Sequence, residues 1–208
     1  MQRTVFRRWR NAPCITIGLA IVNIICFLLV EFTGSSEDVQ HMISCGAAYT
    51  RSIAEDHEYY RLFTSMFLHF GIAHLTNNMI VLVALGRYVE RYVGHMNFLC
   101  FYLLSGLVGS WGSYLYHLQN DSNVVGAGAS GAIFGIVGVM FALIVLHRGR
   151  LANFTMQNML MFILLSVYQA VAEQSVDYVA HGVGFVSGAI IALLWLGYEN
   201  LWERGRKR

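Results

Sequence analysis

The chain of 208 residues is 56% hydrophobic and 12% charged, with a single proline, whereas soluble domains carry roughly a quarter charged residues. This composition excludes an ordinary soluble domain. The net charge is only +2, and the basic residues flank apolar runs, as they do at membrane edges, so no nucleic-acid partner is expected.

The first predicted span, residues 14–32, follows a basic arm, residues 1–13. The span is long enough to cross a bilayer and no small-residue cleavage site follows it, so a cleavable signal peptide is not expected. A polar connection, residues 33–61, comes next. Connections of about 28 residues are usually functional or disordered. Its aromatic end, Tyr59 to Phe63, is amphipathic and is expected to lie in the membrane interface.

Five further spans are predicted after this connection. They cover about residues 73–88, 97–116, 130–146, 155–172 and 179–196. A basic tail, residues 198–208, follows the domain of residues 14–197. The predicted fold class is therefore an all-α membrane protein, a six-transmembrane-helix bundle in which an even number of spans returns both termini to one side.

The charge distribution predicts which side this is. With six spans, twelve of the fourteen Lys and Arg residues lie on the side of the termini, and only Arg51 and Arg61 lie on the other. The positive-inside rule then makes both termini cytoplasmic. Ser130, at the start of the fourth span, is expected near the extracytoplasmic face of the cell (inner) membrane.

No metal or cofactor is expected from the sequence. The four cysteines show no CxxC spacing and lie mostly in apolar runs, which is typical of small apolar fillers. No HExxH or HxxxH pattern occurs, and the spans hold no cluster of carboxylates. The cysteines are Cys14, Cys26, Cys45 and Cys100.

Two spans carry faces of glycine that allow helices to pack main chain to main chain. Their glycines are Gly131 and Gly135 in the fourth span, and Gly184 and Gly188 in the sixth. Ser130 precedes the first face and His181 precedes the second, at the same expected depth. The simpler interpretation is tight packing with an incidental serine and histidine. The alternative is a nucleophile with its base.

The second interpretation assigns roles that fit the chemistry. A serine hydroxyl needs a base within hydrogen-bond reach, which a neutral histidine supplies. No Asp or Glu lies in the fourth or sixth span, so Ser130 and His181 would form a dyad. His74 and Asn78 share a helix face and, with the Ser130 amide, are candidate oxyanion donors, although a polar contact between helices would also explain the pair. Phe134 is placed to pack on the His181 ring.

Three motifs in this order resemble the rhomboid intramembrane serine proteases. The motifs are His74-xxx-Asn78 in the second span, Gly128-Ala129-Ser130-Gly131 at the fourth, and Ala180-His181-xx-Gly184-xxx-Gly188 in the sixth. The resemblance covers about residues 14–197. It implies a six-helix serine protease, a hydrolase that cleaves transmembrane protein substrates in the lipid bilayer near its extracytoplasmic face.

The resemblance also implies roles for individual residues. Ser130 would be the nucleophile, His181 the general base, and His69 a supporting residue. The fifth span with residues 173–177 would form a gate and cap. Two departures are visible: Tyr60-Arg61 stands where the family typically has Trp-Arg, and Phe134 where it often has tyrosine.

Two other classes of function stay open at this point. One is a catalytically inactive rhomboid-like protein that binds membrane helices, against which the presence of both Ser130 and His181 argues. The other is a small transporter. A transporter typically has charges at mid-membrane or inverted repeats, and neither is seen in the sequence.

Overall fold

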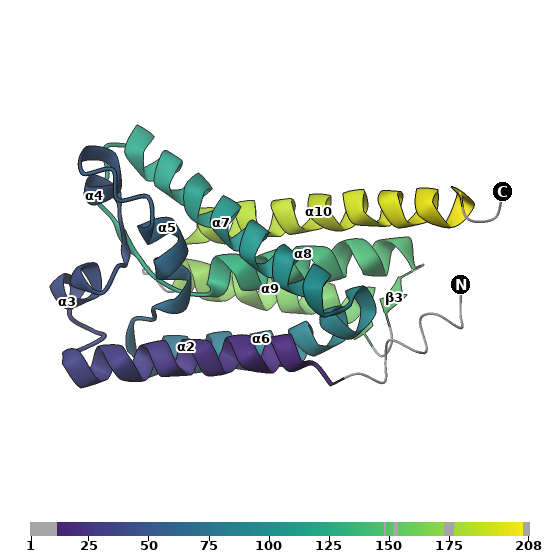
Figure 1. Cartoon of the computed structure of the whole chain (residues 1–208), viewed down its shortest axis with the longest axis horizontal. Helices are drawn as coiled ribbons and strands as arrows, with labels where there is room; N and C mark the ends of the chain where they lie inside the picture. The colour runs from purple at the N-terminus through teal and green to yellow at the C-terminus, as the bar shows by residue number, and fades with distance from the viewer. Residues whose placement is uncertain (1–11, 148, 152–153, 173–176, 206–208) are drawn as a thin grey trace.

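The computed structural model describes residues 12–147, 149–151, 154–172 and 177–205. These residues form a bundle of long helices, with short helices and two small antiparallel sheets in the connections (Figure 1). The long helices are α2 (Cys14–Thr33), α6 (Gly71–Val93), α7 (His95–Gln119), α8 (Ser130–Leu146), α9 (Met156–Ala172) and α10 (Tyr178–Gly205).

Each predicted span lies on one of these helices. The fourth predicted span, residues 130–146, has the same bounds as α8. α10 continues to Gly205, so the predicted tail begins within a helix. Residues 1–11 of the predicted arm and 206–208 of the tail lie outside the described ranges.

Several helices have the length and composition of membrane spans. Among the described residues, α2, α7 and the Tyr178–Glu199 part of α10 each pass this test. The segment Arg61–Phe67 meets α6 at 87°, and the two together count as one broken span or re-entrant segment. α8 is apolar but has 17 residues. The chain is thus a multi-pass membrane protein, and the count of six crossings stays a prediction.

α8 lies at the centre of the bundle, where α7 crosses it and α10 runs along it (Figure 1). A helix that is apolar all round is expected to be enclosed by protein or lipid, and here it is protein that encloses α8. Five of its side chains have no exposed surface at all: Val137, Val139, Met140, Leu143 and Ile144.

Glycine contacts join α8 to α10. A Cβ added to Gly184 would overlap the carbonyl group of Gly131, and one added to Gly188 would overlap that of Gly135. The two helices therefore touch main chain to main chain, which confirms the packing predicted from the four-residue spacing.

α7 completes this core with glycines that the sequence analysis did not single out. A Cβ at Gly109 would lie 3.0 Å from the carbonyl oxygen of Ala180 in α10, and one at Gly106 would lie 2.8 Å from the Cβ of Ala132 in α8. At Gly109 the nearest atoms of α10 belong to its main chain, and such close approach favours dispersion contacts between the helices. α7, α8 and α10 thus form a tightly packed unit that carries the candidate site.

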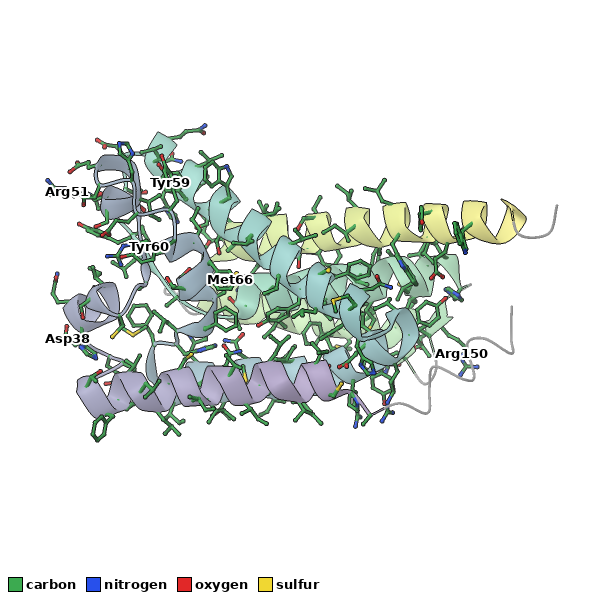
Figure 2. All side chains as sticks on the ribbon, viewed as in Figure 1. Asp38, Arg51, Tyr59, Tyr60, Met66 and Arg150 are labelled. Atoms are coloured by element: carbon green, nitrogen blue, oxygen red, sulfur yellow. The ribbon has the colours of Figure 1, made fainter. Side chains whose placement is uncertain are left out.

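The polar connection after α2 is folded, and it gathers at one end of the bundle (Figure 1). Its elements are α3 (Val39–Ser44), β1 (Ala48–Tyr49), α4 (Thr50–Glu55), α5 (Arg61–Thr64) and the 3₁₀ turn η1 (Ser65–Phe67). Arg51 lies at this end, whereas Arg150 lies at the opposite end (Figure 2). The remaining strands are β2 (Val125–Gly126), β3 (Arg150–Leu151) and β4 (Phe154–Thr155), of which β3 pairs with β4.

Arg61 fastens this connection. Its side chain is buried, and its Nε donates to Glu58 Oε2 at 2.6 Å. One terminal nitrogen, Nη1, donates to the carbonyl oxygens of Ile43 at 2.6 Å and Ala47 at 3.0 Å. A buried guanidinium is stable only when its donors are satisfied in this way. One side chain therefore ties α5 to the turn after α3.

Aromatic side chains of the connection face outward. Tyr59, Tyr60 and Phe63 are exposed, and Tyr59 and Tyr60 lie at the end of the bundle that carries the connection (Figure 2). This exposure agrees with the amphipathic pattern of the sequence. Their position in a membrane interface remains a prediction.

Candidate active site

The segment that leads into Ser130 is held by the long connection. β2 pairs antiparallel with β1, with Ala48 opposite Gly126 and Tyr49 opposite Val125. The two strands are far apart in the sequence, and neither strand has a sequence pattern that predicts the pairing. The position of Ser130 therefore depends on the connection that precedes the second predicted span.

Two hydrogen bonds fix the glycine-rich turn itself. The Gly128 amide donates to the carbonyl oxygen of Ser65 at 2.9 Å. The Ala129 amide donates to Nε2 of His69 at 3.3 Å, and His69 is 1% exposed. His69, predicted as a supporting residue, is thus a buried acceptor for the residue directly before Ser130.

Gly128 marks the point where His74 and Ser130 approach each other. Its φ is +146°, in a region that side-chain-bearing residues rarely adopt. A Cβ there would lie 3.0 Å from His74 Nε2 and 3.6 Å from Ser130 Oγ. The ring of His74 also packs edge-on against that of His69, with centroids 5.2 Å apart. The structure thus brings together four of the residues predicted for the site.

Ser130 is the first residue of α8, and among the described residues no side chain caps this helix start. The first N–H groups of a helix lack intrahelical partners, and the helix dipole gives this end a partial positive charge. The hydroxyl and the amide of Ser130 therefore lie together at the electropositive end of a helix.

His181 lies in the first turns of α10, against α8. Its imidazole stacks on the Phe134 ring with centroids 4.2 Å apart and planes 11° apart, as the sequence analysis expected. The chain neighbours of the predicted dyad also touch, because a Cβ at Gly131 would lie 3.7 Å from Ala180. Ser130 and His181 therefore occupy neighbouring positions on two packed helices.

The two reactive groups are not hydrogen-bonded to each other in this structure. Within the described part of the chain, no hydrogen bond joins Ser130 Oγ to the His181 ring. Catalytic hydrogen bonds are often long in substrate-free enzymes and tighten in the complex.

Asn78 is buried on α6, and its Nδ2 donates to the carbonyl oxygen of His74 at 3.1 Å. The i,i+4 spacing thus produces a local bond along the helix as well as a shared face. One of the two amide hydrogens of Asn78 is used in this way.

Asp177 was missed as a site residue by the sequence analysis. Its Oδ1 accepts a hydrogen bond from the Ala180 amide at 2.9 Å, and its Oδ2 accepts one from Ser113 Oγ at 2.5 Å. It therefore caps the start of α10 and bonds that start to α7. His181 lies one turn after Asp177, and its amide donates to the Asp177 carbonyl oxygen at 3.1 Å. An aspartate just before an apolar helix is a recognisable start signal.

Asp177 is the only described residue of the predicted cap, residues 173–177. The other four residues, 173–176, lie outside the described ranges. The role of α9 and this loop as a gate stays a prediction.

A cavity of about 60 Å³ opens beside Ser130. It lies between α7, α8, the start of α10 and the β1–β2 pair, and it contains several polar groups. Its lining includes Ser130, Gly128, Ser113, His117 and Asp177. A buried water needs roughly 10–15 Å³ of such space and two or more polar partners. The cavity can therefore hold water next to the serine hydroxyl.

Comparison with known proteins points to one family. A model of the Rhomboid domain matches residues 56–198, well over half of the chain. The chain is 32% identical over 195 residues to Rhomboid protease GluP of Bacillus subtilis. The aligned residues make up 94% of this chain and 37% of that protein.

Two plant proteins are similar to the same degree. RHOMBOID-like protein 2 of Arabidopsis thaliana is 33% identical over 177 residues, 84% of this chain and 54% of that protein. RHOMBOID-like protein 1 is 32% identical over 161 residues, 74% of this chain and 40% of that protein. The chain thus spans about two fifths to one half of the length of these relatives. With the matching domain model, these similarities show that the chain belongs to the rhomboid family.

Proposed function

We propose that the chain is an intramembrane serine endopeptidase that cleaves membrane-spanning segments of protein substrates. Ser130 is the nucleophile and His181 the general base. The observation that carries the proposal is the main-chain contact of α8 with α10 at Gly131 and Gly184. This contact sets the hydroxyl and the imidazole at neighbouring positions in a family that includes a named protease.

Acylation follows from these two groups. Ser130 Oγ forms a bond to the scissile carbonyl carbon while its proton passes to the His181 ring. The C–N bond of the substrate then breaks, and the leaving amine takes the proton from His181. Phe134 supports this step because its stacking limits the orientations of the imidazole.

The oxyanion of the tetrahedral intermediate is stabilised where α8 begins. The Ser130 amide is at the positive end of this helix, and the His74 ring lies close to the same point as Ser130 Oγ. Asn78, one turn after His74 on α6, is the third donor. Preorganised donors in a site with little water each contribute a few kcal/mol to such a transition state.

Deacylation needs water at membrane depth. The cavity beside Ser130 has room for water, and Ser113, Asp177 and His117 supply polar groups to its lining. His181 is not among the lining residues, but it directly follows Ala180, which is. A water molecule there attacks the acyl carbon, and His181 takes its proton and returns it to Ser130 Oγ as the ester bond breaks. Non-helical backbone at this depth is tolerated because it lines a cavity or is buried in protein.

The proposed orientation puts both termini in the cytoplasm and the cavity toward the extracytoplasmic face of the cell membrane. It rests on the charge asymmetry of the sequence, and it agrees with the separation of Arg51 and Arg150 to opposite ends of the bundle (Figure 2).

Covalent labelling tests the proposal directly. A fluorophosphonate probe reacts with an activated serine, and we expect it to label the purified full chain in detergent. The variants Ser130→Ala and His181→Ala should lose labelling and should also lose cleavage of a membrane-spanning model substrate. Ser110→Ala is the matched control because Ser110 lines the same cavity. Label that persists in folded Ser130→Ala would refute the assignment.

The second candidate is an inactive rhomboid-like protein that binds membrane helices. Its support is that two of the similar relatives are named RHOMBOID-like proteins, without the word protease. This function predicts a folded wild-type protein that binds the model substrate, takes no label and cleaves nothing.

A further inference from the structure

A cysteine, a glutamate and a histidine come together where α2 begins. This start of α2 lies at the end of the bundle opposite to the long connection (Figure 1). Cys14 is the first residue of α2, Glu90 lies in the last turn of α6, and His95 is the first residue of α7. Cys14 Sγ lies 3.4 Å from His95 Nδ1 and 3.8 Å from Glu90 Oε1, and the last two atoms are 2.5 Å apart.

These distances are close to those around a tetrahedral zinc ion. Zn–S bonds of about 2.3 Å and Zn–N and Zn–O bonds of about 2.0–2.2 Å place sulfur roughly 3.6 Å from nitrogen and oxygen, and nitrogen roughly 3.3 Å from oxygen. The distance from Cys14 to His95 is shorter by about 0.2 Å, and that from His95 to Glu90 by about 0.8 Å, since these two atoms are hydrogen-bonded to each other. A zinc ion in place of the proton between them would increase the distance from His95 Nδ1 to Glu90 Oε1 by about 0.8 Å, and a small side-chain rotation allows this increase.

The environment of Glu90 supports the role of a ligand. Its side chain is fully buried. Oε2 accepts hydrogen bonds from the Thr16 amide at 2.7 Å and from Thr16 Oγ1 at 2.6 Å, and Oε1 accepts one from the Ile15 amide at 2.9 Å. Such bonds hold a metal-binding carboxylate in place. They fix Glu90 so that Oε1 faces Cys14 and His95.

A cation would also balance the charge of this buried carboxylate. In the described part of the chain, the group that forms an ion pair with Glu90 is His95, and only when its ring is protonated. A divalent ion supplies this charge at any pH at which the ligands are deprotonated. Cys14 is exposed and His95 is half-buried, so an ion can reach the cluster from solvent.

We propose that Cys14, Glu90 and His95 form a zinc site that fastens the start of α2 to the junction of α6 and α7. The thiolate, the imidazole Nδ1 and the carboxylate Oε1 supply three ligands, and water supplies the fourth. The site is separate from the proposed active site, and it holds whether or not the chain is a protease. It revises the expectation from sequence that the cysteines are fillers and that no metal binds.

Cobalt(II) is the probe for this site, since a thiolate bound to Co²⁺ gives a charge-transfer band that histidine ligands alone do not give. We expect the tag-free full chain in detergent, kept reduced without added thiols, to show this band and the visible bands of tetrahedral Co²⁺. Added Zn²⁺ should abolish both. Cys14→Ser should lose the charge-transfer band, and His95→Ala should weaken Co²⁺ binding at least tenfold.

Cys45→Ser is the matched control. Its sulfur also lies beside a histidine, 3.6 Å from His41 Nε2, without belonging to a cluster with a carboxylate among the described residues. The band should be unchanged in this variant, and Zn²⁺ should raise the melting temperature of wild type and Cys45→Ser but not of Cys14→Ser. A wild-type protein without the band, or a band that persists in Cys14→Ser, would show that the cluster is a hydrogen-bond network only.

Discussion

The phenyl ring of Phe134 lies nearly parallel to the imidazole of His181, with centroids 4.2 Å apart. Phe134 is one helical turn after Ser130, so the helix that presents the hydroxyl also holds the ring of the proposed base. Because the Phe134 ring covers one face of the imidazole, it limits rotation of the His181 side chain and so the directions in which the imidazole nitrogens point. The hydroxyl and the base are thus positioned by one rigid element.

Replacement of Phe134 by leucine should lower the cleavage rate by about 10- to 100-fold, because small misplacements of a catalytic group have effects of this size. Phe134→Tyr keeps the stacked ring and should stay near wild type. The measurement is kcat for a membrane-spanning model substrate.

Phe141→Leu is the matched control for this change. Phe141 packs against Phe185 across the same two helices, with centroids 5.6 Å apart, and among the described residues it stacks on no ring of the candidate site. We expect this variant to lose stability and keep its rate. Equal rates in Phe134→Leu and Phe141→Leu would contradict a positioning role for Phe134.

Alanine at Gly188 should lower the melting temperature of the protein in detergent by several degrees. The new Cβ would overlap the main-chain carbonyl of Gly135, and main chain cannot move aside as a flexible side chain can. Overpacking of this kind destabilises by about 1–3 kcal/mol. Gly197→Ala, in the same helix with nothing within 4 Å of the new Cβ, should be neutral or slightly stabilising. Similar losses in both variants would point to helix propensity rather than packing.

The sequence alone predicts those parts of the structure that depend on local periodicity. Apolar runs predict the long helices, and glycines four residues apart predict the contact of α8 with α10 because the period of a helix puts them on one face. The stacking of Phe134 on His181 follows from the same reasoning.

Contacts between segments that are distant in the sequence leave no periodic pattern of residues from which they could be predicted. The pairing of β1 with β2 involves two residues from each strand, too few for an alternating pattern to appear. The cluster of Cys14, Glu90 and His95 joins residues that carry no short motif. Arg61 could be noticed as an unusual charge, but its acceptors are main-chain carbonyls, which no sequence pattern reveals.

Removal of the Arg61 side chain should destabilise the long connection. Arg61→Ala leaves two carbonyl oxygens and Glu58 without their buried donor, and each such bond to a charged group contributes about 1.5–3 kcal/mol. Arg51→Ala removes an exposed pair, Arg51 with Glu55, and should change little. Protease nicking between α3 and α6 measures the difference. Equal nicking of the two variants would show that Arg61 does not fasten this segment.

Asn78→Ala should reduce the cleavage rate by about 10- to 1,000-fold with little change in stability, as expected for the loss of one oxyanion donor. Asn77 is its exposed neighbour on α6, so Asn77→Ala controls for the change in helix composition. Single-turnover rates on the model substrate compare the two. A wild-type rate in Asn78→Ala would remove Asn78 from the oxyanion site.

Asp177 provides the sharpest test of how α10 is positioned. Its carboxylate accepts bonds from Ala180 and Ser113, so Asp177→Ala should destabilise the helix start by about 1 kcal/mol. If this loss of about 1 kcal/mol comes entirely from the interactions that position His181, the cleavage rate drops about fivefold. Asp177→Asn keeps the cap, since asparagine caps as well as aspartate, and should recover most of the rate.

The matched control is Asp38, which caps α3 through bonds from the Gln40 and His41 amides. Asp38→Ala removes a cap of the same kind far from His181 and should leave the rate unchanged. Equal rate losses in Asp177→Ala and Asp177→Asn would instead assign the effect to the charge of Asp177 on His181, because only the charge differs between aspartate and asparagine at a preserved cap.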